Sequence, residues 1–252
     1  MIFDADTHLS PAKEGSNSVN AEGLLRLMDM SGVDKCLSWV YPPYIKTDLD
    51  SYVAYVAESM KRYSDRIYGF GWIDPTLGHE KALNLTKRCM QEYGMYGVKL
   101  NGSQNKYYID DKDKTYPIVE EVSKAGRIVA FHTGSDDPDH VHPYRAEKVI
   151  RDFPDTKFLM IHMGGTLCKA AIEVAQRCGN VTLVGSEAPK DGVLRAIETL
   201  GAERVAFGSD APFCVMSAEV GAYKGMLKSA QLTDEEIELV MYKNIAKLIN
   251  IP

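Results

Sequence analysis

Short apolar runs alternate with longer amphipathic segments along the whole chain. Two of the runs, Ile128–Phe131 and Phe158–Ile161, contain only apolar residues, as is typical of parallel strands that are covered on both faces. Runs of this kind predict eight strands, at Ile2–Asp6, Lys35–Val40, Ile67–Trp72, Gly97–Asn101, Ile128–His132, Phe158–His162, Val181–Val184 and Val205–Gly208.

The segments between these strands repeat their apolar residues at helical spacing. They predict helices at Ala21–Met30, Leu49–Tyr63, Glu80–Tyr93, Tyr116–Lys124, Arg145–Asp152, Leu167–Arg177, Gly192–Leu200 and Ala218–Ser229. A last helical stretch is expected over Leu232–Ile251, with Thr233 as its N-cap.

Eight strand–helix units in 252 residues correspond to about 30 residues per unit, as in (β/α)8 barrels. This repeat favours an α/β fold with one domain over residues 1–252, a single (β/α)8 TIM barrel followed by an extra C-terminal helix. The main alternative, a doubly wound open sheet, usually has a glycine-rich turn after its first strand. No such turn follows Asp6.

Composition and charge narrow the function classes. The net charge is −6 and the Lys and Arg residues are scattered, so no nucleic acid partner is expected. No membrane contact is expected either, because no apolar stretch reaches the roughly 18 to 20 residues of a membrane span. The five cysteines lack CxxC spacing, which favours a reducing, cytoplasmic location. The expected partner is a small-molecule substrate, and a homodimer is one alternative for the oligomeric state.

Ionisable residues gather at the carboxyl ends of the predicted strands. Asp6 and His8 lie at the end of the first strand, His132 ends the fifth, His162 ends the sixth, and Asp210 follows the eighth. In a closed barrel these ends meet at one mouth, where the active sites of such barrels lie. Each residue alone has an ordinary structural explanation, such as a helix cap at Asp210, but the joint pattern predicts a metal site.

Alternate residues of a strand point the same way, so Asp6 and His8 can reach one ion. Imidazole nitrogen combined with carboxylate oxygen suits Zn²⁺, Mn²⁺ or Fe²⁺. We expect one divalent metal ion, with zinc preferred over manganese or iron, that lowers the pKa of a bound water. Asp210 could ligate the ion and accept the proton of this water, and His162 could polarise a substrate carbonyl or protonate a leaving group.

Four short motifs contain these residues: Asp4-Ala5-Asp6-Thr7-His8, Phe131-His132-Thr133-Gly134, His162-Met163-Gly164-Gly165 and Gly208-Ser209-Asp210-Ala211-Pro212. In this order they resemble the motifs of the amidohydrolase superfamily. The resemblance is to its amidohydrolase-2 branch in particular, which includes enzymes similar to aminocarboxymuconate-semialdehyde decarboxylase.

The resemblance implies a distorted (β/α)8 barrel in which Asp6, His8, His132 and Asp210 surround the metal. It also implies that His162 is a catalytic or substrate-facing residue. Asp6 stands where the usual motif has its first histidine, and a carboxylate at this place favours a harder ion such as Mn²⁺.

Four further residues are candidates for the substrate pocket. Lys99 on the predicted fourth strand is expected to contact an anionic group of the substrate. Trp72 and Asn101, at the ends of the third and fourth strands, could line the pocket or only pack within the fold. Glu187, after the seventh strand, is a candidate for binding or proton transfer. His140, in the loop over residues 134–143, is expected to lie outside the metal site.

Three functions follow from these expectations. The first is a metal-dependent hydrolase that uses a metal-activated water on a small-molecule amide, lactone or ester. The second is a lyase, a non-oxidative decarboxylase of an aromatic or unsaturated carboxylic acid, in which Asp210 protonates carbon. The third is a metal-free or non-catalytic barrel that binds a small ligand. Few Arg residues lie near the strand ends, which favours hydrolysis because a decarboxylase should grip a carboxylated ring.

Overall fold

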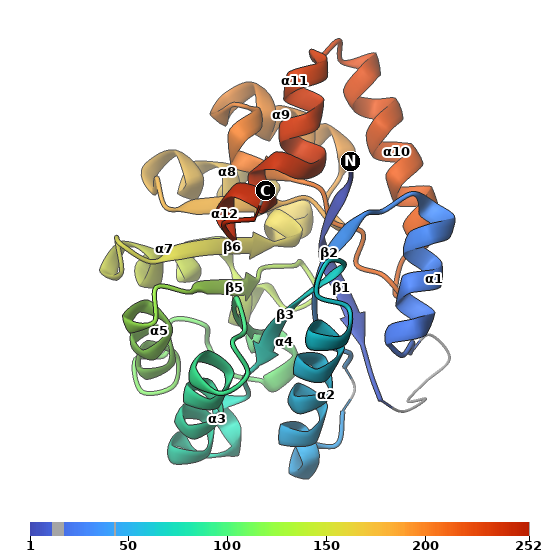
Figure 1. The fold of residues 1–252 in the computed structure, drawn as a ribbon. Helices are drawn as coiled ribbons and strands as arrows, with labels where there is room; N and C mark the ends of the chain where they lie inside the picture. Colours follow the sequence, from blue (N-terminus) through green and yellow to red (C-terminus); the bar gives the residue numbers. More distant parts are fainter. Residues whose placement is uncertain (12–17, 43, 252) are drawn as a thin grey trace.

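The computed structural model describes residues 1–11, 18–42 and 44–251, which form one barrel of parallel strands (Figure 1). The strands are neighbours in chain order from β1 to β8. Their bounds are β1 Phe3–Leu9, β2 Lys35–Val40, β3 Ile67–Trp72, β4 Gly97–Leu100, β5 Ile128–His132, β6 Lys157–Ile161, β7 Val181–Val184 and β8 Val205–Ala206. The predicted α/β TIM barrel is confirmed.

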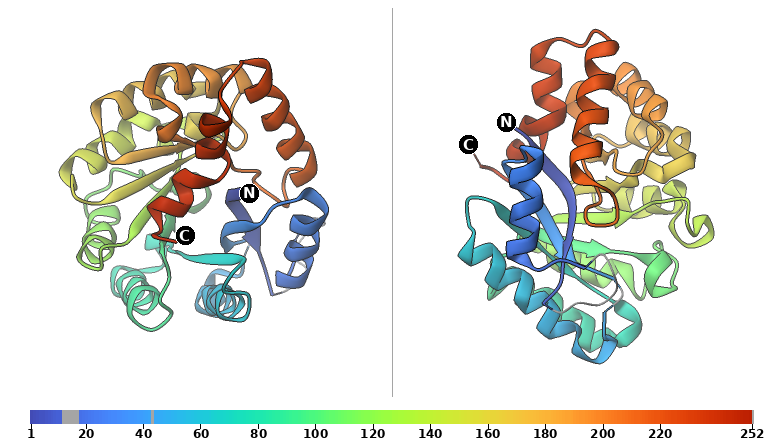
Figure 2. Two further views of the ribbon diagram at one scale, coloured as in Figure 1. Left: turned by 45° about the horizontal axis from the view of Figure 1, so that its top comes forward. Right: turned by 90° about the vertical axis from the view of Figure 1, so that its right-hand side faces the viewer.

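Helices surround the strands on the outside, as the left view of Figure 2 shows. The longer ones are α1 Ala21–Ser31, α2 Leu49–Arg62, α3 His79–Gln91, α5 Thr115–Lys124, α7 Pro143–Asp152, α8 Cys168–Arg177, α9 Lys190–Leu200 and α10 Met216–Ser229. The shorter ones are α4 Gly102–Asn105, α6 Pro138–Val141, α11 Asp234–Glu238 and α12 Asn244–Leu248. Short 3₁₀ segments lie at η1 Lys46–Asp48, η2 Pro75–Leu77, η3 His162–Leu167 and η4 Ala202–Arg204, and η5 Leu239–Lys243 is π-helical.

Helix α1 illustrates how the sequence sets these elements. The Asn20 side chain accepts a hydrogen bond from the backbone N–H of Gly23 and so caps the first turn. Leu24 and Met28, one turn apart, are completely buried and form the inner face of the helix. Gly32 ends the helix with a φ of 68°, a conformation that glycine adopts without strain.

The barrel closes at a seam between β1 and the segment that follows β8. The backbone N–H of Asp210 donates to the Asp6 carbonyl at 2.9 Å, and the backbone N–H of His8 donates to the Ala211 carbonyl at 2.8 Å. A side chain also bonds across the seam: Asp4 Oδ1 accepts a hydrogen bond from the backbone N–H of Ser209 at 2.8 Å. The seam therefore brings Asp6 and His8 of β1 next to Asp210, which follows β8.

Most predicted boundaries agree with the structure to within two residues. Strand β1 is the exception, because it continues to Leu9, where Thr7 and His8 still pair with β2. The expected C-terminal helical stretch consists of α11, η5 and α12, and Thr233 forms the capping box of α11. No helix in the described part of the chain is long and apolar enough to cross a membrane. All five cysteines are free.

Candidate metal centre and active site

Three possible metal ligands converge from the two sides of the seam. Asp6 and His8 lie on β1 and Asp210 follows β8, and one ligand atom of each lies within 4.8 Å of the other two. His8 Nε2 is 3.1 Å from Asp210 Oδ1 and 3.7 Å from Asp6 Oδ1. All three side chains are buried, so their charges are poorly screened by water.

The protonation of His8 places a lone pair beside these carboxylates. Its Nδ1 is 3.0 Å from the Val40 carbonyl oxygen, which can only accept a hydrogen bond, so Nδ1 carries the proton. Burial lowers the pKa of His8 to about 4, although Asp6 opposes this effect, and the ring is therefore neutral near pH 7. Nε2 is left unprotonated and accepts a hydrogen bond from Trp39 Nε1 at 3.2 Å.

A divalent cation fits this arrangement. Asp6 Oδ1 is buried and has no hydrogen-bond partner among the described residues. Burial, together with the charges of Asp6 and Glu187, raises the pKa of Asp210 well above its ordinary value. Buried carboxylates that face one another are unfavourable unless a proton or a cation lies between them. The nitrogen and oxygen donors of Asp6, His8 and Asp210 suit a transition-metal ion.

Asp210 does not cap a helix, the alternative role considered for it. The next helix, α10, begins only at Met216, and Asp210 has a φ of 58°, which few non-glycine residues adopt. Below the site, Asp4 Oδ1 accepts the backbone N–H of both Asp6 and Ser209. Asp4 therefore fixes the spacing between the strand of Asp6 and the turn of Asp210.

His132 lies beside this group rather than within it. Its Nε2 is 2.8 Å from Asp136 Oδ1. Burial by itself would raise the pKa of Asp136, but the pairing with His132 holds this pKa well below its ordinary value. Asp136 also accepts a hydrogen bond from Ser103. Gly134 lets the loop fold back over the ring, because a Cβ there would lie 3.0 Å from His132 Nε2. A fourth-ligand role for His132 stays a prediction, and Asp136 is a site residue that the sequence analysis missed.

His162 reaches the mouth from the first position of η3. Its Nδ1 is 3.0 Å from Ser186 Oγ, 3.5 Å from Asp6 Oδ2 and 3.8 Å from Glu187 Oε2. Burial, together with the neighbouring His132 and Lys99, lowers the pKa of His162 well below its ordinary value, so the ring is neutral. Glu187 is half-buried, which raises the pKa of its carboxyl. Ser186 is a second residue that the sequence analysis missed.

Lys99 is a buried cation of the mouth. Its side chain comes from β4 and is only 1% exposed, and Nζ has no hydrogen-bond partner in the described part of the chain. Nζ lies 4.1 Å from the centroid of the Trp39 ring. Burial lowers the pKa of Lys99 to about 8, although the charges of Asp6 and Asp210 act to raise it. The ammonium form therefore still predominates at pH 7. An ammonium without a hydrogen-bond acceptor is costly to bury, and a bound anion would relieve that cost.

Aromatic rings form a wall of the mouth beside His8. Tyr41 and Phe213 stack with ring centroids 4.7 Å apart and an interplanar angle of 11°. Phe213 meets the His8 ring edge-on at 5.2 Å and is 41% exposed. The wall therefore offers a flat apolar surface next to the candidate metal ligands.

Trp72 and Asn101 are buried and make contacts that stabilise the fold. The indole N–H of Trp72 donates to the Tyr44 hydroxyl at 3.0 Å. The side chain of Asn101 accepts the backbone N–H of Gln104 at 2.9 Å and caps α4. A role for either residue in the substrate pocket stays a prediction.

Replacing His140 with alanine is expected to leave the metal content unchanged. Its Nδ1 is 2.9 Å from Asp137 Oδ1, and its ring stacks on Tyr108 with centroids 4.8 Å apart. These contacts hold the imidazole of α6 against Asp137 and against the segment that follows α4. Elemental analysis of the metal-loaded variant checks this, and a lower metal-to-protein ratio than wild type would place the loop in the metal site.

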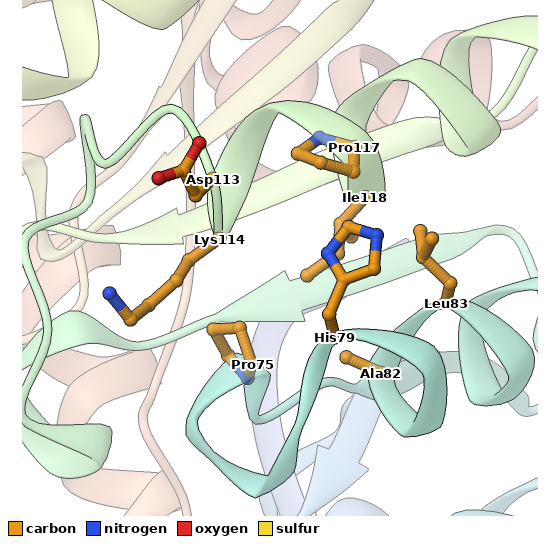
Figure 3. Close-up of a pocket in the computed structure, with 8 residues that line it drawn as sticks. All are labelled: Pro75, His79, Ala82, Leu83, Asp113, Lys114, Pro117 and Ile118. Carbon is orange, nitrogen blue, oxygen red and sulfur yellow. The ribbon is translucent and has the colours of Figure 1, made fainter.

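A cavity on the outside of the barrel is separate from this site. It has a volume of about 240 Å³ and lies between α3 and α5, with His79 on one side and Asp113 and Lys114 on the other (Figure 3). Pro75 and Ile118 contribute apolar walls. None of the residues that converge at the mouth lines it.

Solved structures include similar barrels at low sequence identity. The 5-carboxyvanillate decarboxylase of Sphingomonas paucimobilis is 16% identical, with a TM-score of 0.77 over 100% of this chain and 99% of that chain. The 2,6-dihydroxybenzoate decarboxylase of Rhizobium is 16% identical, with a TM-score of 0.75 over 99% and 98%. The 5-carboxyvanillate decarboxylase of Novosphingobium aromaticivorans, complexed with manganese and 4-hydroxy-3-methoxy-5-nitrobenzoic acid, is 15% identical, with a TM-score of 0.78 over 100% and 96%.

Sequence comparison identifies the family. No curated protein sequence matches the chain, but the amidohydrolase-2 family model, described as amidohydrolase, matches residues 46–251. The matched span contains Lys99, His132, His162 and Asp210, and the fold agrees with the barrel that the sequence motifs implied. The chain therefore belongs to the amidohydrolase-2 family.

Proposed function

We propose that this protein is a manganese-dependent, non-oxidative decarboxylase of an aromatic or unsaturated carboxylic acid. The observation that carries the proposal is the buried Lys99 ammonium, which lacks a hydrogen-bond partner among the described residues at a mouth that also holds Asp6, His8 and Asp210. An anionic ligand would supply the missing acceptor. The decarboxylases among the similar structures, one of them complexed with manganese, support the same reaction.

Asp6, His8 and Asp210 would hold the ion, with His132 as a candidate for a further ligand. When bound, the ion would withdraw electron density from the substrate oxygens and orient them. Two carboxylates with one imidazole make an oxygen-rich ligand set, which suits manganese better than a nitrogen- or sulfur-rich set would. Manganese therefore replaces zinc as the preferred ion.

Asp210 would supply the proton. In the proposed reaction, the proton of its carboxyl group moves to the ring carbon that bears the carboxylate. The bond between that carbon and the carboxylate then breaks, its electron pair returns to the ring, and CO₂ leaves. Asp210 regains a proton from solvent. In the absence of a cation, burial and the neighbouring charges of Asp6 and Glu187 raise the pKa of Asp210, so that this carboxyl group can carry a proton near neutral pH.

Lys99 would bind an oxygen that stays on the ring, either a phenolate or a second carboxylate. A cation held against the departing carboxylate would stabilise a charge that disappears as CO₂ forms, and would slow the step. The neutral His162 would accept a hydrogen bond from a ring hydroxyl. The stacked rings of Tyr41 and Phe213 would pack against the substrate ring.

Replacing Lys99 with methionine is expected to raise KM for an anionic aromatic acid by about 10- to 100-fold, the cost of one charge-assisted hydrogen bond. The change in kcat is expected to be smaller, because the ammonium binds a group that does not react. Steady-state kinetics on the manganese-loaded variant measure both constants. An unchanged KM would remove Lys99 from the substrate site.

The reaction itself is tested on manganese-loaded protein with 5-carboxyvanillate and 2,6-dihydroxybenzoate, beside a set of aromatic amides, esters and lactones. Manganese-dependent release of labelled CO₂ from a carboxyl-labelled acid is the expected result. Manganese-dependent hydrolysis of an amide, ester or lactone, without any decarboxylation, would overturn the proposal. Hydrolysis has family membership as its support, and no contact among the described residues of the site favours it over decarboxylation.

A further inference from the structure

We infer that Ser186 is a positioning residue of the metal centre, which fixes the orientation in which Asp6 meets the cation. Ser186 follows β7 and is completely buried. Its hydroxyl group lies between Asp6 of β1 and His162 of η3. The inference rests on the metal centre of the proposed function, but not on the reaction.

The direction of the hydrogen bonds around Ser186 follows from their donors. His162 Nδ1 is 3.3 Å from the Ser186 carbonyl oxygen and 3.0 Å from Ser186 Oγ. A carbonyl oxygen only accepts, so Nδ1 carries a proton and donates to Ser186. The single hydroxyl proton of Ser186 is then free to be donated to Asp6 Oδ2. The bonds therefore run from His162 to Ser186 and from Ser186 to Asp6.

This arrangement gives the two oxygens of Asp6 different tasks. Oδ2 accepts the Ser186 proton, whereas Oδ1 has no hydrogen-bond partner in the described part of the chain and lies 3.7 Å from His8 Nε2. Oδ1 is therefore the oxygen presented to a cation, and the bond to Oδ2 prevents rotation of the carboxylate. Groups that orient a metal ligand in this way typically change metal affinity about 10- to 100-fold when they are removed.

The experiment is a titration of metal-free protein with Mn²⁺ in the absence of substrate, with free Mn²⁺ followed by electron paramagnetic resonance. Ser186→Ala is expected to raise the Kd for Mn²⁺ about 10- to 100-fold. Ser186→Thr keeps the hydroxyl and is expected to bind close to wild type. Ser38→Ala is the matched control, because it removes a buried hydroxyl on β2 whose one hydrogen bond to a described residue goes to the Thr7 carbonyl, at 3.4 Å.

A wild-type Kd in Ser186→Ala would overturn the inference, as would an equal loss in Ser38→Ala. If the alanine variant does not fold, Ser186→Cys keeps the shape of the side chain with a slightly larger atom and a weaker donor, and it is expected to show the same direction of change. Wild-type protein that binds no Mn²⁺ would overturn both the metal centre and this inference. Wild-type protein that binds Mn²⁺ tightly but decarboxylates nothing would overturn the proposed function alone.

Discussion

Replacing Asp210 with asparagine is expected to lower kcat by about 10²- to 10⁴-fold, the range that general acid catalysis contributes. The variant loses the carboxyl proton that the proposed reaction transfers to carbon. Asparagine tolerates positive φ better than most residues, so the backbone at a φ of 58° is expected to keep its bond to the Asp6 carbonyl. The measurement is the rate of CO₂ release at saturating substrate.

Two controls separate proton transfer from metal binding and from folding. Asparagine retains one side-chain oxygen as a ligand, so the assay is run at saturating Mn²⁺ and the bound metal is measured in parallel. Asp113→Asn makes the same chemical change at an exposed carboxylate on the outside of the barrel and is expected to keep full activity. An Asp210→Asn variant with wild-type kcat would remove Asp210 as the acid.

The double variant Asp6→Ala/His8→Ala is expected to retain less than about one tenth of the manganese that wild type retains, because even the loss of an orienting group costs 10- to 100-fold in affinity. Added Mn²⁺ should raise the melting temperature of wild type but not of the variant.

Elemental analysis after metal loading and dialysis checks this result, with thermal unfolding of both proteins as the second measurement. His140→Ala is the matched control, because it removes an imidazole that lies in α6, after β5, and is paired with Asp137. About one manganese per chain retained in the double variant would show that the ion binds elsewhere.

Hydrophobic periodicity was sufficient to locate the barrel strands, because strands buried on both faces appear as apolar runs. It placed the end of β1 too early, because the polar residues Asp6, Thr7 and His8 interrupt the apolar pattern although they still belong to the strand. Helices α4 and α6 were missed for a different reason. Each has four residues, fewer than a helical period needs to become visible.

The candidate site was predictable only where the fold's topology determines the position of a residue. Asp6, His8 and Asp210 follow from the rule that the carboxyl ends of barrel strands meet at one mouth. Asp136 and Ser186 do not, because they lie on loops whose path depends on tertiary contacts. In the sequence Asp136 differs from its acidic neighbours only by standing four positions after His132.

The first choice between hydrolysis and decarboxylation depended on a count of arginines. That count overlooked Lys99, whose cation is placed at the mouth by β4 and left without a hydrogen-bond partner among the described residues. Trp39 lies against it at 4.1 Å. Under the proposed function, a buried cation without a hydrogen-bond partner indicates an acid-binding site more directly than the abundance of one residue type does.

The position of the candidate ligands at the seam has a consequence for mechanical integrity. His8 and Asp210 are 202 positions apart in the chain, on opposite sides of the line where the first and last strands meet. β8 contributes only two residues to the sheet, so direct pairing along that line is sparse. A cation bound by residues from both sides would link the first and last strands of the barrel. It would therefore oppose their separation during unfolding. Catalytic competence and closure of the barrel would then depend on the same bound ion.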